Sequence, residues 1–292
     1  MKRLFLLCVV AMCVVFSFRA QGQETISIGE RHTLFSRLLN EERAYWVYQP
    51  EKRPGGTERN YPVLYLLDGD SFFHTVVGFT RFFSSSRVSS LPPCVVVAVL
   101  NTDRTRDLTP TPSAARRDGT VRSGDEPKGG GAEQFYRFLV EELRPAIEKE
   151  FPVGGQNMLV GHSFAGLFAL HVLWNHPESF DTYMALDPSL WWDQGAFLKQ
   201  AGTRGDKTVF DGKQLYVAFA TRPRTERNLI HFPLTDTFLD TVIPEMERCN
   251  LRVVSKKFPE ETHGTIALPA IYDGLKCLPD DIFSFQCGKM TK

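Results

Sequence analysis

Short apolar runs alternate with longer amphipathic segments along most of the chain. Two runs, Val63–Leu67 and Val95–Leu100, are almost wholly apolar, as strands buried on both faces of a parallel sheet are. Before Pro50 the apolar and polar positions alternate, which predicts an antiparallel edge. The predicted strands are Ala44–Tyr48, Val63–Leu67, Cys94–Leu100, Met158–Val160, Tyr183–Leu186, Leu215–Ala220 and Val253–Phe258.

Segments with helical periodicity lie between these strands. The clearest is Ala132–Phe151, in which Pro145 predicts a kink and one face is formed by Phe135, Phe138, Leu139, Leu143 and Ile147. The other predicted helices are Ala165–Asn175, Asp236–Cys249 and Ile266–Leu278. The order strand, helix, strand, helix predicts an α/β fold: a doubly wound, mostly parallel sheet with an antiparallel N-terminal edge, in three α-β-α layers.

Segment 101–131 interrupts this alternation. It is rich in Asp, Arg, Thr, Pro and Gly, and it ends in Gly129-Gly130-Gly131. Because strands and helices resume on both sides, we interpret the segment as a long functional loop within one domain.

The N-terminus has the pattern of a secretory signal peptide. Lys2 and Arg3 precede an apolar run of 15 residues, Leu4–Phe18, which is shorter than the roughly 20 residues of a membrane-spanning helix. Small residues follow, and Ala20 and Gly22 would occupy positions −3 and −1 before the cleavage site.

The predicted organisation is therefore a signal peptide over 1–22 and a single catalytic domain over 23–292, exported to the periplasm or secreted. The alternative is a membrane anchor that is never cut. A lipoprotein is disfavoured, because Cys13 follows Met12 where a small residue is expected. After signal removal no stable membrane insertion is expected.

Charge excludes one class of partner. The 34 basic and 34 acidic side chains give a formal net charge of zero, and losing Lys2, Arg3 and Arg19 with the signal changes it from 0 to −3. The basic excess of a nucleic-acid-binding protein is absent. Apolar residues at 42% and charged residues at 23% are ordinary for a soluble globular protein.

Four cysteines remain outside the signal: Cys94, Cys249, Cys277 and Cys287. An oxidising compartment permits a disulfide, and Cys277 with Cys287 is the pair closest in sequence. Buried free thiols are the open alternative. The spacings do not match a zinc site, and we expect neither a metal nor an organic cofactor.

The most informative motif is Gly161-His162-Ser163-Phe164-Ala165, between a predicted strand and a predicted helix. A nucleophilic serine at such a turn has a strained backbone and needs small neighbours at −2 and +2. Ser163 is therefore the candidate nucleophile. The backbone N–H of Phe164, at the helix N-terminus, is a candidate oxyanion donor.

A histidine base should follow the last strand, because the order in this type of fold is serine, acid, histidine. Only His231 and His263 lie well past Ser163, and His263 comes directly after the last predicted strand, so it is the candidate base. The acid is less determined. Glu226 is the first carboxylate after strand Leu215–Ala220, and Asp187 after the preceding strand is the alternative.

A serine–histidine dyad with only a weak partner for the imidazole is also open. The second oxyanion donor should come from the loop after Val63–Leu67, where Gly69 allows the N–H of Asp70 to point into the site.

Several motifs together resemble one family. They are Val63–Gly69, Asn101–Thr111, the stretch GHSFAGLFAL, Pro188-Ser189-Leu190-Trp191-Trp192, and Glu261-Thr262-His263-Gly264. In this order they resemble the putative-esterase family of α/β-hydrolases, in particular its siderophore branch, typified by periplasmic ferric enterobactin esterases. The resemblance implies an α/β-hydrolase fold, a serine esterase without a large lid, and Ser163 with His263 as the catalytic pair.

The resemblance also implies substrate contacts. In that branch an arginine of the segment matching Asp103–Thr111 helps to bind the anionic catecholate ligand, which points to Arg106 or Arg104 here. An arginine paired with Asp103 or Asp107 to hold the loop is an equal alternative. Trp191 and Trp192 are expected at the cleft border, where one could stack on a substrate ring.

The sequence thus predicts an exported serine carboxylic-ester hydrolase that acts through an acyl-enzyme on a small-molecule ester, such as a siderophore ester. The alternatives are a feruloyl or acetyl esterase acting on plant polysaccharides, an acyltransferase, and an inactive binding protein on the same fold. The oligomeric state is not predicted.

Overall fold

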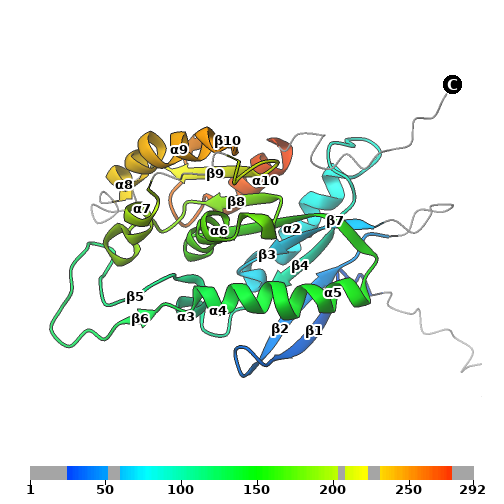
Figure 1. Cartoon of the computed structure of the whole chain (residues 1–292). Helices are drawn as coiled ribbons and strands as arrows, with labels where there is room; N and C mark the ends of the chain where they lie inside the picture. The colour runs from blue at the N-terminus through cyan, green and yellow to red at the C-terminus, as the bar shows by residue number, and fades with distance from the viewer. Residues whose placement is uncertain (1–24, 52–59, 203–207, 223–230, 278–292) are drawn as a thin grey trace, which may run out of the picture.

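The computed structural model describes residues 25–51, 60–202, 208–222 and 231–277. Its centre is an eight-stranded sheet in the order β1-β2-β4-β3-β7-β8-β9-β10 (Figure 1). The strands are β1 Glu30–Ser36, β2 Glu41–Tyr48, β3 Tyr61–Leu66, β4 Val95–Val99, β7 Val153–His162, β8 Thr182–Leu186, β9 Gln214–Ala220 and β10 Arg252–Phe258. β2 pairs antiparallel with β1 and β4, and the other neighbours are parallel.

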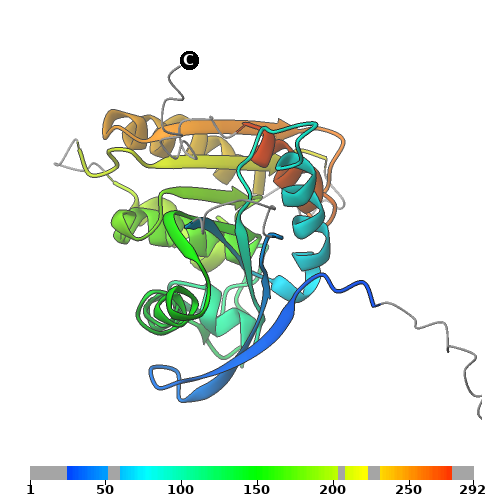
Figure 2. The same cartoon turned by 90° about the vertical axis from the view of Figure 1, so that its right-hand side faces the viewer.

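Helices cover both faces of this sheet (Figures 1 and 2). One layer holds α2 Gly69–Phe83 and α10 Ala267–Cys277, and the other holds α4 Ala132–Arg137, α5 Arg144–Glu150, α6 Phe164–Asn175 and α9 Ile243–Arg248. The predicted α/β fold, with its mostly parallel sheet and antiparallel N-terminal edge, is confirmed.

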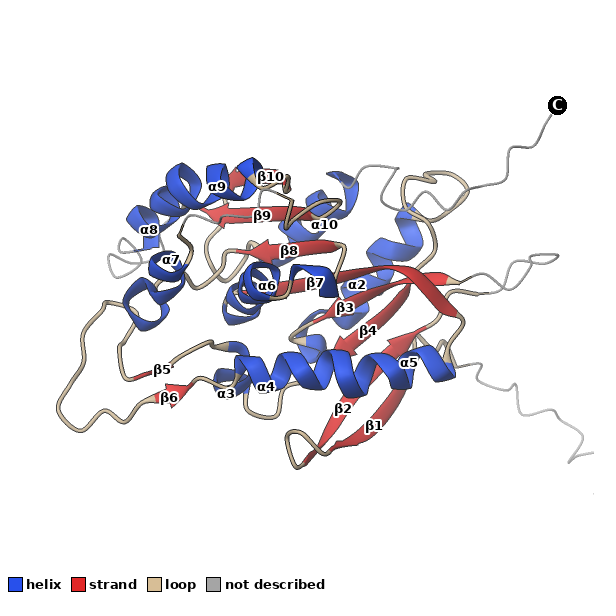
Figure 3. Cartoon of the chain, in the orientation of Figure 1, coloured by secondary structure: helices blue, strands red, loops and turns tan. Residues whose placement is uncertain are grey.

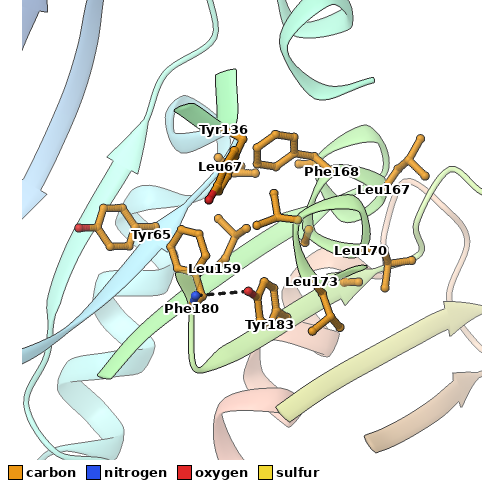
Figure 4. Close-up of a cluster of buried hydrophobic side chains, with 14 of the residues drawn as sticks. Tyr65, Leu67, Tyr136, Leu159, Leu167, Phe168, Leu170, Leu173, Phe180 and Tyr183 are labelled. Carbon is orange, nitrogen blue, oxygen red and sulfur yellow. Dashed lines mark hydrogen bonds between the residues drawn. The ribbon is translucent and has the colours of Figure 1, made fainter. Parts of the chain in front are cut away.

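The core has two halves because strand side chains alternate between the faces. In β3, Val63 and Tyr65 pack with the layer of α6, whereas Leu64 and Leu66 pack with the layer of α2. Figure 4 shows the first half, in which leucines and aromatic rings fill the space between α6 and the sheet. Helix α6 is buried along nearly its whole length, and it packs against β7 and β8.

The helix predicted over Ala132–Phe151 is present from Ala132 to Glu150, and its middle is π-helical. A π-helical stretch, Phe138–Leu143, separates α4 from α5, and Pro145 lies in the first turn of α5. Proline has no N–H to donate to the preceding turn. The π-helical stretch before it shifts the hydrogen-bond pattern from i→i−4 to i→i−5, so the helix continues past the missing donor. The same arrangement recurs before α9, where Pro244 follows the π-helical residues Phe238–Val242.

Segment 101–131 contains short elements rather than a plain loop. It begins with α3, Arg104–Leu108, and contains the antiparallel pair β5 Pro112–Ser113 and β6 Lys128–Gly129. Figure 3 shows this pair, with α7 Ala196–Gln200 and α8 His231–Thr237, on the side to which the arrowheads of β8 and β9 point. Segment 101–131 therefore borders the carboxyl ends of the parallel strands.

Three other expectations concern features at the chain ends and the thiols. The predicted signal peptide, residues 1–22, lies outside the described residues. Within the described ranges, no helix has the length and apolar character that crossing a bilayer requires. Among the described residues, Cys94, Cys249 and Cys277 form no disulfide with one another. Cys287 lies outside these residues, so its pairing with Cys277 stays a prediction.

Phe168 tests the packing of the core half shown in Figure 4. Its side chain is 0% exposed in α6, so Phe168→Ala should lower the free energy of unfolding by about 3–5 kcal/mol through lost burial and a cavity. The matched control is Phe35→Ala on β1, where the residue is 55% exposed and a change within about 0.5 kcal/mol is expected. Urea denaturation measures both, and equal losses would contradict the assigned core.

Candidate active site

Ser163 sits on a sharp turn between β7 and α6. Its backbone has φ 63° and ψ −118°, a conformation that residues with a side chain rarely adopt. A Cβ added to Gly161 would lie 2.2 Å from the carbonyl oxygen of Ala165, so only glycine fits there. The turn thus depends on the small residues at −2 and +2, and it holds the Ser163 hydroxyl at the carboxyl end of β7.

His263 meets Ser163 from the other side of the site. It lies between β10 and α10, and its Nε2 atom is 3.0 Å from the Ser163 Oγ atom. The imidazole is 21% exposed, so it is shielded from most solvent and still reachable. With Nδ1 protonated, Nε2 carries a lone pair that can accept the hydroxyl proton of Ser163.

Asp187 holds the opposite edge of that imidazole. It follows β8 directly, and its Oδ2 atom lies 2.6 Å from Nδ1 of His263. Its Oδ1 atom accepts the N–H of Ala220 at 3.0 Å, and the side chain is 1% exposed. The buried carboxylate therefore fixes the tautomer and orientation of His263. Glu226, the other candidate for this role, lies outside the described residues, so its assignment stays a prediction.

The two candidate oxyanion donors lie in the first turns of two helices. Phe164 begins α6, and Asp70 is the second residue of α2. The first N–H groups of a helix have no acceptor within the helix and are available to a ligand. A Cβ on Gly69 would lie 2.7 Å from Cβ of Ala98, so glycine lets the turn between β3 and α2 pack closely against β4.

Arg104 stabilises the turn between β3 and α2. Its Nε and Nη2 atoms donate to the carboxylate of Asp68 at 2.7 and 2.9 Å, and Asn101 donates to the same carboxylate at 2.8 Å. Asp68 precedes α2 with φ 52°. Nη2 of Arg104 also reaches the carbonyl oxygen of His162 at 3.3 Å. Arg104 therefore links the turn before α2 to the end of β7.

Arg106 belongs to an ion-pair cluster that fixes α3 to the sheet. Its guanidinium bonds Glu41 at 2.6 and 3.1 Å and Asp107 at 2.7 Å, and the fully buried Arg43 bonds Asp107 at 2.6 Å. These bonds raise the pKa of Arg106 and lower that of Glu41. Arg106 thus takes the alternative role, a loop-holding arginine paired with Asp107.

The two tryptophans are placed differently. Trp192 is 6% exposed, and its Nε1 atom donates to the carbonyl oxygen of Thr111 at 2.9 Å. Trp191 is half-buried, and its ring centroid is 5.7 Å from that of Phe164. Trp191 is therefore the one with surface left for a ligand, and Trp192 joins segment 101–131 to the wall beside Ser163.

Two contacts at the site involve residues that the sequence analysis did not assign. The Nε2 atom of His162 lies 2.9 Å from the carbonyl oxygen of His263, and burial lowers the pKa of His162 to about 4. The ring is therefore neutral near pH 7, and its N–H donates to that carbonyl. Ser189 Oγ lies 3.2 Å from Ser163 Oγ. In the sequence, both residues could have been found by their position, because His162 directly precedes Ser163 and Ser189 follows Asp187 by two residues.

The site is built from hydroxyl, imidazole, carboxylate and backbone N–H groups. Within the described ranges, no group of three or more His, Cys, Asp or Glu side chains is arranged to hold a metal ion. A hydroxyl bonded to an imidazole that is in turn bonded to a buried carboxylate is the geometry of nucleophilic acyl transfer.

Comparison with known proteins finds relatives that are esterases. The model of the family described as "Putative esterase" matches residues 36–220. The ferri-bacillibactin esterase BesA of Bacillus subtilis is 32% identical over 170 residues, covering 55% of this chain and 59% of that protein. The siderophore enterobactin esterase of Emericella nidulans is 29% identical over 247 residues, covering 74% of this chain and 81% of that protein.

Solved structures agree with these matches. The IroE-like serine hydrolase of Shewanella oneidensis is 33% identical, with a TM-score of 0.74 over 85% of this chain and 79% of that chain. The BES protein of Bacillus cereus has a TM-score of 0.67 at 24% identity, over 88% of this chain and 97% of that chain, which shows the same fold.

The buried His162 makes a prediction about acid stability. Because its folded pKa of about 4 lies below the ordinary value of 6.5, the unfolded chain takes up a proton between these values and the folded chain does not. The unfolding free energy should therefore fall as pH drops from 6.5 to 4, by roughly 2–3 kcal/mol from this residue.

His162→Gln removes the titrating ring and should flatten this part of the pH dependence, measured by urea unfolding at several pH values. The control is His74→Gln, which changes an exposed histidine on α2 and should leave the slope as in the wild type. An unchanged slope in His162→Gln would refute the buried neutral state.

Proposed function

This chain belongs to the esterase family matched by residues 36–220, and from that premise we propose that it is a serine carboxylic-ester hydrolase acting through an acyl-enzyme. The observation that carries the proposal is the double contact of His263, with Ser163 at Nε2 and Asp187 at Nδ1. One ring can then take a proton from the serine while its positive charge is balanced by the buried carboxylate.

In the first half of the proposed reaction, Ser163 Oγ attacks the ester carbonyl carbon and its proton passes to Nε2 of His263. The carbonyl oxygen becomes an oxyanion, which the N–H groups of Phe164 and Asp70 stabilise. When this intermediate collapses, the bond to the alcohol oxygen breaks and His263 returns the proton to the leaving alcohol. The acyl group stays on Ser163 as an ester.

In the second half, water replaces the alcohol. His263 takes a proton from the water as its oxygen attacks the acyl-enzyme, and the same donors hold the second oxyanion. Collapse releases the carboxylic acid and returns the proton to Ser163. Asp187 keeps the imidazole oriented throughout, and the chemistry uses no group beyond these side chains and backbone amides.

For the substrate we propose an ester of a siderophore. The support is the family membership together with the names of the relatives, which are a ferri-bacillibactin esterase and a siderophore enterobactin esterase. For the location we propose export, which the basic start and apolar run of the first 22 residues support.

Ser163→Ala tests the nucleophile. It should lower kcat for p-nitrophenyl acetate by about a millionfold and abolish labelling by a fluorophosphonate probe. Ser189→Ala is the matched control, because Ser189 has the nearest other hydroxyl, 3.2 Å from Ser163 Oγ; its loss should be at most about tenfold. Near-normal turnover by Ser163→Ala would contradict the assignment.

The two candidate acids make a separate prediction. Asp187→Asn should lower kcat by about 10⁴-fold, because the imidazole loses its tautomer-fixing carboxylate. Glu226→Gln should change kcat by less than about threefold. Steady-state assays with p-nitrophenyl acetate compare the two variants, and the reverse order of effects would assign the role to Glu226.

A substrate panel separates the siderophore ester from the other esters. Ferric enterobactin, methyl ferulate and acetylated xylan are offered to the wild type and to Ser163→Ala, and acid release is followed for each. The proposal expects the highest kcat/KM on ferric enterobactin. A preference for methyl ferulate or acetylated xylan would keep the esterase chemistry and reject the siderophore.

A further inference from the structure

The arginines that the sequence offers for substrate binding are already engaged by carboxylates of the same chain. Asp68 accepts two bonds from Arg104, and Arg106 is held by Glu41 and Asp107. An anionic substrate would have to compete with these short contacts. A cation with an unsatisfied guanidinium would suit that task better.

Two adjacent arginines in the loop between β5 and β6 have contrasting surroundings. Arg116 is exposed, and its guanidinium donates two hydrogen bonds of 3.0 Å to Asp125. Arg117 is half-buried, and its Nε atom is shielded from solvent without a hydrogen-bond partner. In the part of the chain that the structure describes, no carboxylate forms an ion pair with Arg117.

The loop that carries Arg117 is anchored to the wall of the site. Its start is held by the bond from Trp192 Nε1 to Thr111, and Ala115, two residues before Arg117, is buried and bonded to Ser113 Oγ at 3.0 Å. The ring centroid of Trp192 is 5.0 Å from that of Phe164, the residue next to the nucleophile. The strand that leads into this loop is thus fixed to Trp192, whose ring packs against the residue next to Ser163.

The guanidinium of Arg117 interacts with a charge of the site. Burial lowers the pKa of its guanidinium, and the negative charge of Asp187 opposes this effect. The acidic group that acts on the Arg117 guanidinium is therefore the carboxylate that holds His263. Both carboxylate oxygens of Asp187 already accept hydrogen bonds, from Ala220 and His263, and the guanidinium N–H groups are left for another acceptor.

We propose, on the basis of the esterase function above, that Arg117 is a specificity-determining residue that binds a pair of neighbouring anionic oxygens on the substrate. A guanidinium presents parallel N–H groups that match two such oxygens, as in a catecholate or a carboxylate. Partial burial of an unpaired cation is unfavourable in the free protein. A ligand that supplies the counter-charge removes this cost and gains a charge-assisted bond.

The kinetic test compares Arg117→Gln with Arg116→Gln, a matched variant in the same loop. On ferric enterobactin, whose iron is bound by catecholate oxygens, Arg117→Gln should raise KM about 10- to 100-fold. Its effect on neutral p-nitrophenyl acetate should be at least about tenfold smaller. Arg116→Gln should leave both substrates as in the wild type. Equal losses on the two substrates, or no loss on ferric enterobactin, would overturn the proposal.

A binding measurement separates this proposal from the esterase function itself. In the Ser163→Ala background, calorimetry with 2,3-dihydroxybenzoate should show about 10- to 100-fold weaker binding after Arg117→Gln. The neutral 2,3-dihydroxybenzamide should lose less than about threefold. If this difference appears in a protein whose wild type hydrolyses no ester, the function fails and the anion site stands. If esters are hydrolysed but both ligands bind both variants equally, the anion site fails alone.

Discussion

The geometry of the site depends on the hydrogen bonds of Asp187. The backbone N–H of Asp187 donates to the carbonyl oxygen of Ala218 at 2.7 Å. One oxygen of its carboxylate accepts the N–H of Ala220, and the other bonds His263. One buried residue therefore joins the carboxyl ends of β8, β9 and the segment after β10. Because these strands are paired in a rigid parallel sheet, the imidazole is held in place before any substrate arrives.

A second network does the same for the oxyanion turn. Arg104 ties Asp68 to the end of β7, and the cluster of Arg43, Glu41, Asp107 and Arg106 fixes α3 to β2. Asp107 and Arg43 are both 1% exposed, where an unpaired charge would be strongly destabilising. The chain has a formal net charge of zero, and Arg43, Arg104 and Arg106 are each paired with a carboxylate. Arg117 differs from them, because its buried Nε atom has no hydrogen-bond partner.

Sequence patterns were sufficient for the elbow and for the sheet from β2 to β10, but β1, Glu30–Ser36, was not among the predicted strands. The apolar strands and the glycine before Ser163 act locally, so their signals lie in adjacent residues. Helix α2 was not predicted as a helix, although Phe73, Val76, Val77, Thr80 and Phe83 share its buried face. Its many phenylalanines, together with Gly78 inside it, weaken the helical signal, because both residue types are poor helix formers.

The acid and the arginines depended on contacts that are distant in sequence. Asp187 and Glu226 each follow a strand in the sequence. The contact of Asp187 with His263, 76 residues further along the chain, is visible only in the tertiary structure, and Glu226 lies outside the described residues. Asp68, the partner of Arg104, lies 36 residues away, and Glu41, one of the two partners of Arg106, lies 65 residues away. Local sequence cannot show whether an arginine in segment 101–131 is already paired.

Proton NMR of the bond between His263 and Asp187 tests the central claim most directly. A short hydrogen bond from an imidazole N–H to a buried carboxylate should give a resonance far downfield of the amide protons. We predict that this resonance is present in the wild type and in Glu226→Gln and absent in Asp187→Ala. A resonance that survives in Asp187→Ala and disappears in Glu226→Gln would contradict the account.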